Sequence, residues 1–461
     1  MKTALLITLF LPILLLACRK DSFITSADAN ISISADTLHY DTVFTSVGSV
    51  TQSFKIFNDN NQKLRLSSVK LMGGTSSPFN INVDGFATSE ATNLEIEAND
   101  SLYVFVQVNI DPATGNLPFI IRDSIQISYN GNNRFVQLEA WGQNAHFLRN
   151  KEVISGETWT NDLPYVIQGY LYVAHNQTLA IEKGCRIYVH ADAPVIIDGT
   201  LKVNGGKDTI DRVYFNGDRL DEPYKDFPAS WPGIYFRTSS HDNVLNYAVI
   251  RNAYQSIAME NPSPNVNPKL TLNECVIDNS YDAGIIALNS SITATNCLVS
   301  NCGKNVALVK GGDYTFTHCT IASYSNNFIQ HKDPVLLVSN TDGTSTATLT
   351  ALFRNCIFWG EGGELEDEVI VIKSSIDYVN FDYNLWKVKT PPQDIITAGI
   401  INNQDPQFDS INVSKNYYDF RLTKKNSPAI DAGTNTSITI DLDGALRPAG
   451  LKPDLGCFEK Q

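Results

Sequence analysis

The sequence of 461 residues lacks the short motifs that mark several common enzyme classes. It contains no His-Glu-x-x-His, no Gly-x-Ser-x-Gly and no phosphate-binding glycine loop. Its seven histidines are scattered without the spacing of metal ligands, and no Cys-x-x-Cys occurs. These absences argue against zinc peptidases, serine hydrolases of the nucleophile-elbow type and P-loop enzymes.

Positive charge is also scarce. The chain carries 35 lysines and arginines against 49 aspartates and glutamates, a formal net charge of −14. An acidic protein is poorly suited to bind nucleic acid or an anionic membrane surface, so we expect neither as a partner. No long amphipathic helix pattern occurs, and the chain is rich in Asn, Ser, Thr, Val and Ile. This composition predicts an all-β protein that is large enough for more than one core.

The chain does contain a repeated phrase built around cysteine. Cys275, Cys297 and Cys319 follow one another at intervals of 22 residues, and Cys356 and Ala248 occupy the same position in similar phrases. Alternate residues of each copy are apolar, which is the period of a β-strand. One strand per repeat predicts parallel strands stacked about 4.8 Å apart, with the cysteines in an interior column.

A second column supports the same fold. Asn252, Asn279 and Asn301 each lie four residues after the cysteine position, where stacked turn asparagines can bond along the axis. The opening phrase Thr178–Ile187 is close to the first coil of right-handed parallel β-helix repeat proteins, which residues 161–382 resemble. The resemblance implies a fold but no function, because lyases, hydrolases, tailspikes and adhesins all use it.

The cysteines of the repeat are expected to be reduced. Eight cysteines occur, and seven of them follow Cys18, an odd number that leaves at least one unpaired. Stacked side chains point in the same direction, whereas a disulfide needs converging Cβ vectors. We therefore interpret them as core residues and not as catalytic or metal-binding groups.

The N-terminus has the features of an export signal. An apolar run that starts at Ala4 is too short to span a membrane and ends in Leu15–Cys18. This ending resembles the bacterial lipobox, which implies that several acyl chains on Cys18 anchor the protein to a membrane. We predict a signal peptide over residues 1–17 and a polar tether over residues 18–30. An ordinary cleaved secretory signal is the alternative.

The residue after the lipobox cysteine bears on location. It is Arg19, and not the aspartate that in many bacteria retains lipoproteins in the inner membrane. The resemblance therefore implies an outer-membrane protein held by its lipid anchor. The periplasmic and cell-surface faces both stay open.

Residues 31–145 show strong alternation without a repeat. Leu102, Val104, Val106 and Val108 share one face of a predicted strand, and about seven such strands indicate an immunoglobulin-like sandwich. The phrase Val47–Asn58 resembles the immunoglobulin-like domains of the abnormal-spindle and Hydin type. That resemblance implies a spacer or an adhesion unit.

We predict that the β-helix covers residues 146–400 and that residues 401–461 form a separate C-terminal domain. The phrases Asn426–Gly433 and Asp454–Glu459 resemble those of the choice-of-anchor Q domain. Since a solenoid needs its open end covered, we expect this domain to cap the β-helix.

Polysaccharide lyases on this fold need a Lys or Arg base beside a calcium site lined by acidic residues. Positions next to the cysteine column supply Arg251, Glu274, Asp278 and His318, which could lie on one wall. The columns are chemically mixed and lack a concentrated acidic cluster. A solvated outer face therefore explains them better than a catalytic site.

Two further sets of residues are candidates for binding. Asp441 and Asp443 have the start of a calcium-loop spacing, although an aspartate–glycine turn explains them better. Tyr224 and Trp231 lie near carboxylates, as in a sugar-stacking loop, although cover for the first coils is the preferred explanation. We expect no cofactor, with calcium as the one open alternative.

Taken together, the sequence predicts a lipid-anchored protein that binds an extracellular polysaccharide or another surface partner without cleaving it. A polysaccharide lyase or glycoside hydrolase on the same fold is the first alternative. A structural envelope protein without a ligand is the second. The enzyme alternative predicts a groove in which a Lys or Arg faces two or more carboxylates.

Overall fold

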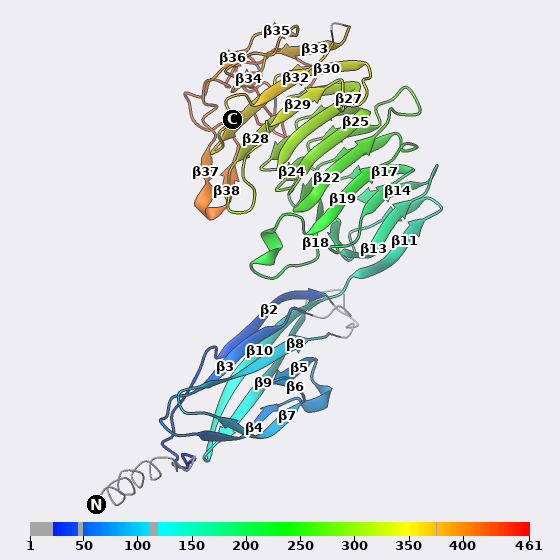
Figure 1. Cartoon of the computed structure of the whole chain (residues 1–461). Helices are drawn as coiled ribbons and strands as arrows, with labels where there is room; N and C mark the ends of the chain where they lie inside the picture. Colours follow the sequence, from blue (N-terminus) through cyan, green and yellow to red (C-terminus); the bar gives the residue numbers. More distant parts are fainter. Residues whose placement is uncertain (1–21, 45–48, 111–118, 375) are drawn as a thin grey trace, which may run out of the picture. The chain divides into compact units, whose positions relative to one another are not determined.

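The computed structural model describes residues 22–44, 49–110, 119–374 and 376–461. These residues form two compact units, which meet in sequence between Asn144 and Ala145. Both are built from β-strands (Figure 1). The helical elements in the described ranges are three single 3-10 turns, Gly74–Ser76, Tyr224–Asp226 and Val413–Lys415. The predicted all-β class is confirmed.

The first unit is a sandwich of two five-stranded sheets, ordered β1-β3-β8-β5-β6 and β2-β10-β9-β4-β7. Neighbouring strands are antiparallel except β2 and β10, which run parallel. This arrangement agrees with the immunoglobulin-like sandwich predicted from the alternation. Its strands are β1 Ile31–Ile33, β2 Thr37–Phe44, β3 Gln52–Asn58, β4 Leu64–Leu71, β5 Phe79–Val83, β6 Phe86–Ala87, β7 Glu90–Ile96, β8 Ser101–Val108, β9 Phe119–Tyr129 and β10 Asn132–Gln143.

Strand β8 shows why the sandwich forms. Leu102, Val104 and Val106 are buried in the core between the sheets, while the intervening Tyr103 is exposed. The strand lies between β3 and β5, so both of its backbone edges are hydrogen-bonded. The phenol of Tyr40 on β2 also donates to the carbonyl oxygen of Val106 at 2.6 Å and so links the two sheets.

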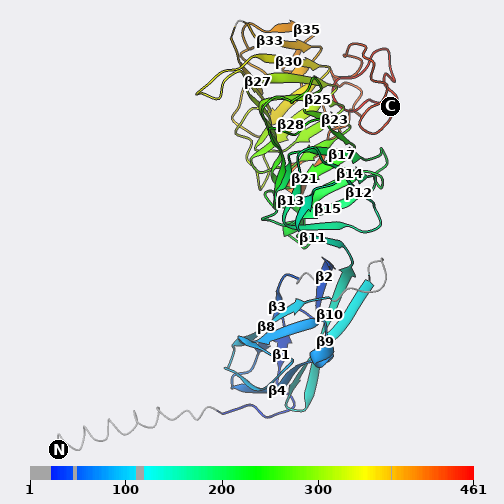
Figure 2. The same ribbon diagram turned by 90° about the vertical axis from the view of Figure 1, so that its right-hand side faces the viewer.

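The second unit is a parallel β-helix of 26 strands, β11 to β36, in which every pair runs parallel. The pairings between coils place the strands in three columns, and Figures 1 and 2 show the stacked strands. Column 1 contains β12 Glu157–Trp159, β14 Thr178–Glu182, β17 Thr200–Asn204, β20 Asn243–Asn246, β23 Leu270–Asn273, β30 Leu349–Arg354, β33 Tyr378–Asp382 and β35 Ile396–Ala398.

Columns 2 and 3 complete each coil. Column 2 contains β15 Arg186–Val189, β18 Val213–Gly217, β21 Ala248–Arg251, β24 Val276–Asp278, β26 Leu298–Ser300, β28 Thr320–Tyr324, β31 Ile357–Glu361, β34 Leu385–Trp386 and β36 Ile401–Asn402. Column 3 contains β16 Val195–Ile197, β19 Trp231–Phe236, β22 Ala253–Glu260, β29 Leu336–Ser339 and β32 Val369–Ile372. Four long strands bend from one column into the next: β11 His146–Val153, β13 Tyr165–Val173, β25 Ala283–Thr295 and β27 Lys304–Thr317.

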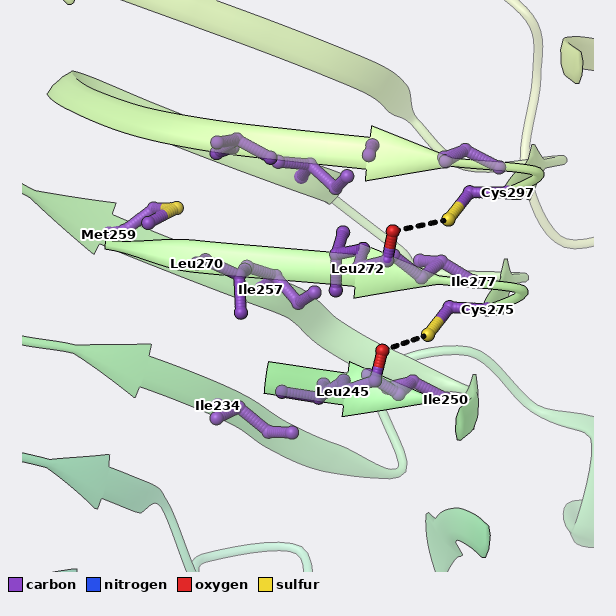
Figure 3. Packing of buried hydrophobic residues seen from close by; sticks show 14 of the residues in the cluster. Ile234, Leu245, Ile250, Ile257, Met259, Leu270, Leu272, Cys275, Ile277 and Cys297 are labelled. Atoms are coloured by element: carbon purple, nitrogen blue, oxygen red, sulfur yellow. Dashed lines mark hydrogen bonds between the residues drawn. The ribbon is translucent and has the colours of Figure 1, made fainter. Parts of the chain in front are cut away.

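The cysteine repeat marks the turn from column 1 to column 2, and the interior column predicted from the 22-residue spacing is confirmed. The Sγ atom of Cys275 donates to the carbonyl oxygen of Leu245 in the preceding coil at 3.2 Å, and Cys297 repeats this contact with Leu272 (Figure 3). All seven cysteines in the described residues are free and buried: Cys185, Cys275, Cys297, Cys302, Cys319, Cys356 and Cys457.

The predicted asparagine column forms the corner between columns 2 and 3. Asn252, Asn279 and Asn301, the corner asparagines, have left-handed backbones, which asparagine tolerates better than most residues. The amide of Asn279 donates to Oδ1 of Asn252 at 2.7 Å, and that of Asn252 donates to Oδ1 of Asn216 at 2.9 Å. These bonds join successive coils at a point where the backbone turns.

Residues 404–461, the C-terminal segment, lie along the flank of column 2, which corrects the predicted cap over the open end (Figure 2). The outward side chains of column 2 are apolar, as at Val249, Val276 and Leu298, and need cover from water. The segment supplies it with Phe408, Phe420, Leu422, Leu442, Leu455 and Phe458. It also carries the hairpin of β37 Ser410–Asn412 and β38 Tyr417–Asp419.

Candidate functional site

Two of the predicted site residues lie side by side. Arg251 ends β21 and Asp278 ends β24, and the two are paired in the parallel register of adjacent coils. Arg251 Nε lies 3.6 Å from Asp278 Oδ2, with about half of the arginine side chain (52%) exposed. Both side chains point outward from the end of column 2, beyond the apolar flank that the C-terminal segment covers.

These residues form one wall of a polar cleft of about 340 Å³. Ser300, from the next coil, extends this wall, and the hairpin β37–β38 supplies the opposite one with Lys415 and Tyr417. Because the walls come from segments more than 100 residues apart, sequence patterns could not have joined them. Lys415 and Tyr417 were accordingly not predicted.

Hydrogen bonds fix the carboxylate in the cleft. Oδ1 of Asp278 accepts from the hydroxyl of Ser300 at 2.7 Å, and the amide of Asn301 lies 3.4 Å away. The buried Oδ1 of Asn279, which also lines the cleft, has no hydrogen-bond partner among the described residues. Tyr417 is 53% exposed, while burial raises the pKa of the half-buried Tyr418 phenol beside it.

Two loops close the cleft on the side of column 3. The loop of residues 218–230 accepts hydrogen bonds from the corner asparagines, through the carbonyl oxygens of Lys225 and Asp226. The loop of residues 325–335 approaches from the other end, and the Phe227 and Phe328 rings meet with centroids 5.1 Å apart. Asp226 and Asn326 thereby line the cleft as well.

Glu274 and His318 do not share this wall, which corrects the prediction that all four residues face one groove. Both lie in the turn from column 1 to column 2, with left-handed backbones, and the C-terminal segment buries them. Glu274 accepts a hydrogen bond from the amide of Asn296 at 3.0 Å, and burial raises its pKa.

Nδ1 of His318 accepts from the guanidinium of Arg447 in the C-terminal segment, and Nε2 lies 3.2 Å from the hydroxyl oxygen of Thr436, to which it donates. Burial, and then the guanidinium of Arg447, lower the pKa of His318 to about 2, so the ring is neutral. Arg447 is itself fully buried, donates to two backbone carbonyls and pairs with Glu459 at 3.4 Å. This cluster holds the C-terminal segment in place and offers no accessible acid or base.

The predicted calcium ligands have other partners. Oδ1 of Asp441 accepts the backbone N–H groups of Asp443 and Ala445, and Oδ2 accepts that of Glu459. Asp443 pairs with the guanidinium of Arg421 at 2.8 Å. These are cationic or N–H donors, so the two aspartates form the turn that was the preferred explanation. The described residues contain no group of three or more His, Cys, Asp or Glu side chains suited to hold a metal.

The two aromatic candidates differ from each other. Trp231 is completely buried in the core of the β-helix, and its indole N–H donates to the carbonyl oxygen of Arg251 at 2.8 Å, so it is not a binding residue. Tyr224 is exposed in the loop of residues 218–230, with the guanidinium of Arg219 4.0 Å from its ring centroid. One face of that ring is therefore occupied.

Cys18 and the predicted signal peptide lie outside the described residues. The described ranges contain no helix with the length and apolar character of a bilayer span.

No protein-family model and no curated protein matches the chain. A family 123 glycoside hydrolase from Clostridium perfringens matches with 12% identity over 29% of this chain and only 30% of that chain, at a TM-score of 0.19. The seventh PapD-like domain of human CEP192 matches with 7% identity over 28% of this chain and 92% of its own, at 0.18. Pectate lyase Pel9A matches with 12% identity over 69% of this chain and 96% of its own, at 0.26. At these TM-scores the fold assignment rests on the strand pairing of this chain.

Proposed function

We propose that this protein binds an uncharged extracellular polysaccharide in the cleft between column 2 and the hairpin β37–β38, and does not cleave it. The observation that supports this is the exposed ring of Tyr417 in one wall, opposite Arg251 and Asp278 in the other. An aromatic face packs against the C–H face of a sugar, while charged groups and amides bond its hydroxyls.

The charges of the cleft favour an uncharged chain. Its two cationic side chains, Arg251 and Lys415, are matched by two carboxylates, Asp226 and Asp278. A site for a polyanion needs an excess of cations, because each anionic group that leaves water needs a partner. With the whole chain at −14, long-range attraction of an acidic polysaccharide is also unfavourable.

We also propose that acyl chains on Cys18 anchor the protein to the outer membrane. The support is the resemblance of Leu15–Cys18 to the lipobox. A Cys18→Ser variant should move from the membrane fraction to the soluble fraction and lose metabolic labelling with a fatty acid. Retention of both properties by the variant would contradict the anchor.

The binding proposal is tested by incubating the purified protein with neutral and acidic polysaccharides, with and without calcium, and following both retention and chain shortening. Tyr417→Ala should weaken retention of a neutral chain by about tenfold, the usual cost of one lost stacking contact. Tyr378→Ala is the matched control, since this tyrosine on β33 is similarly exposed (46%) and lies outside the cleft.

Each other outcome has a definite meaning. Shortening of the chains would favour the lyase or hydrolase alternative, which rests on the same neighbours Arg251 and Asp278. Stronger retention of acidic chains would contradict the assignment of an uncharged ligand. If the chains are neither retained nor shortened, the result would favour a structural envelope protein.

A further inference from the structure

A second feature lies at the corner between columns 2 and 3, beyond the loops that close the cleft. Tyr254, Tyr281 and Gly303 each follow a corner asparagine by two residues, so they take equivalent places in three consecutive coils. The hydrogen bonds agree with this equivalence. The N–H of Tyr281 donates to the carbonyl oxygen of Ala253, as that of Gly303 does to Ser280, both at 3.0 Å.

The two tyrosine rings stack, and the stack ends at the glycine. Their centroids are 6.0 Å apart at an interplanar angle of 26°, and the residues are 44% and 54% exposed. A Cβ atom on Gly303 would lie 2.3 Å from the carbonyl oxygen of Tyr281 and 2.7 Å from that of Asp282. Since no side chain fits there, the next coil leaves the Tyr281 ring uncovered.

The space beside Tyr281 is a cavity of about 310 Å³. Tyr281 and Gly303 line it from the β-helix, and Phe328 lines it from the loop of residues 325–335. Tyr254 is not part of the lining, so the cavity lies on the side of Tyr281 away from its stacking partner. This volume is at the lower end for ligand sites and suits one ring with its substituents.

The rim of the cavity is polar and balanced in charge. The ammonium group of Lys304 lies 2.8 Å from Oδ1 of Asp282, whose other oxygen accepts from the amide of Gln255 at 2.7 Å. Lys332 and Asp333, from the loop of residues 325–335, add a second cation and a second carboxylate. Neighbouring donors and acceptors of this kind suit the adjacent hydroxyls of a sugar.

The loop that supplies Phe328 is fixed at its base. His331 is buried, and its Nε2 lies 2.9 and 3.0 Å from the two carboxylate oxygens of Glu368, which is also buried. The N–H of His331 donates to the hydroxyl of Ser325 at 3.0 Å. A wall held in this way needs little ordering when a ligand enters.

We propose that this cavity is a second carbohydrate site, which takes a single terminal pyranose stacked on Tyr281. It rests on the proposed function only for the class of ligand, because none of its residues lines the cleft. The two sites together would bind a branched or end-capped glycan through its chain and its terminus.

The test uses the methyl glycosides of glucose, galactose and mannose as probes, with saturation-transfer NMR and titration of the purified protein. The protein should bind at least one glycoside, and Tyr281→Ala should weaken that binding by about tenfold. Phe328→Ala is the second variant. It alters the same cavity from the loop, so it tests the site even if Tyr281→Ala fails to fold, and it should also weaken binding. Tyr254→Ala, which removes the ring outside the cavity, is the matched control and should retain most of the binding.

The outcomes separate this site from the cleft. Glycoside binding that survives Tyr417→Ala and is lost in Tyr281→Ala supports the second site, even if no polysaccharide is retained. Binding lost in Tyr417→Ala and kept in Tyr281→Ala places the sugar in the cleft and overturns the second site alone. Absence of binding of all three glycosides also overturns it, while polysaccharide retention still decides on the cleft.

Discussion

Two pairs of side chains flank column 2 in nearby coils and have opposite surroundings. Arg251 and Asp278 line an open cleft, whereas Glu274 and His318 are buried under the C-terminal segment. Glu274 and Asp278 belong to one coil and are only four positions apart in sequence. Accessibility along this flank is therefore set by which part of column 2 the C-terminal segment covers, and not by the local sequence.

The turn from column 1 to column 2, which the C-terminal segment covers, shows that buried polar groups need hydrogen-bond or ionic partners. The neutral ring of His318 accepts from Arg447 at Nδ1 and donates to Thr436 at Nε2, and Arg447 is paired and bonded to backbone carbonyls. The cleft at the other end of the column 2 strands has no such requirement, and the Arg251–Asp278 ion pair there spans 3.6 Å with about half of the arginine side chain exposed. The same residue types thus serve cohesion at one end and remain available to a ligand at the other.

The largest loss of stability is expected when Arg447, at the covered turn, is replaced. Arg447→Met leaves the buried carboxylate of Glu459 without its cation and is expected to cost about 3–5 kcal/mol of unfolding free energy. Denaturant unfolding of the second unit measures it. Lys389→Ala, which breaks an exposed pair with Glu366, is the control and should cost less than about 1 kcal/mol. Equal effects of the two substitutions would contradict the role given to Arg447.

The pH dependence of stability should carry a contribution from His318. Its pKa falls from 6.5 to about 2 on folding, so below pH 6.5 the unfolded chain binds the proton that the folded protein excludes. This contribution is present above pH 6.5 and is lost as the pH falls, by about 2 kcal/mol between pH 6.5 and 5.

His318→Gln keeps an acceptor for Arg447 and removes the titration. The variant should therefore lose less stability than the unmodified protein between pH 7 and 5, as followed by denaturant unfolding at each pH. Buried carboxyls with raised pKa values, such as Glu274 and Asp454, act in the opposite direction, but they are common to both proteins. If stability changed equally with pH in the variant and the unmodified protein, the exclusion of a proton from folded His318 would be contradicted.

The smallest effect on stability is expected in the cleft. Arg251→Ala removes a half-exposed side chain whose ion pair spans 3.6 Å, so the free energy of unfolding should change by less than about 1 kcal/mol. Retention of a neutral polysaccharide should nevertheless weaken. A stability loss as large as that of Arg447→Met would mean that the two ends of the flank do not differ as described.

Much of the fold could be predicted because its signals are local. The alternation in Ser101–Val108 and the spacing of Cys275, Cys297 and Cys319 both report which side chains face inward, and the structure agrees. Alternation also accounts for Trp231, which begins β19 and faces the core, so the weaker alternative of a sugar-stacking residue does not apply to it.

The site could be predicted only in part. Arg251 and Asp278 followed from their column, but Lys415 and Tyr417 reach the cleft through a contact more than 130 residues away in sequence. One signal for the covered flank was present. Val276 and Leu298 follow the column cysteines and are apolar at outward positions, which indicates that something packs on them.

The column of buried cysteines can report the order in which the coils of the β-helix open. Consecutive coils carry Cys275, Cys297 and Cys319, whose burial raises their pKa values well above normal and keeps them from alkylating reagents. Each can react only after its own coil has opened. If the coils open one at a time from the end near β36, Cys319 is labelled first and Cys275 last, whereas a single cooperative opening labels all three at one rate.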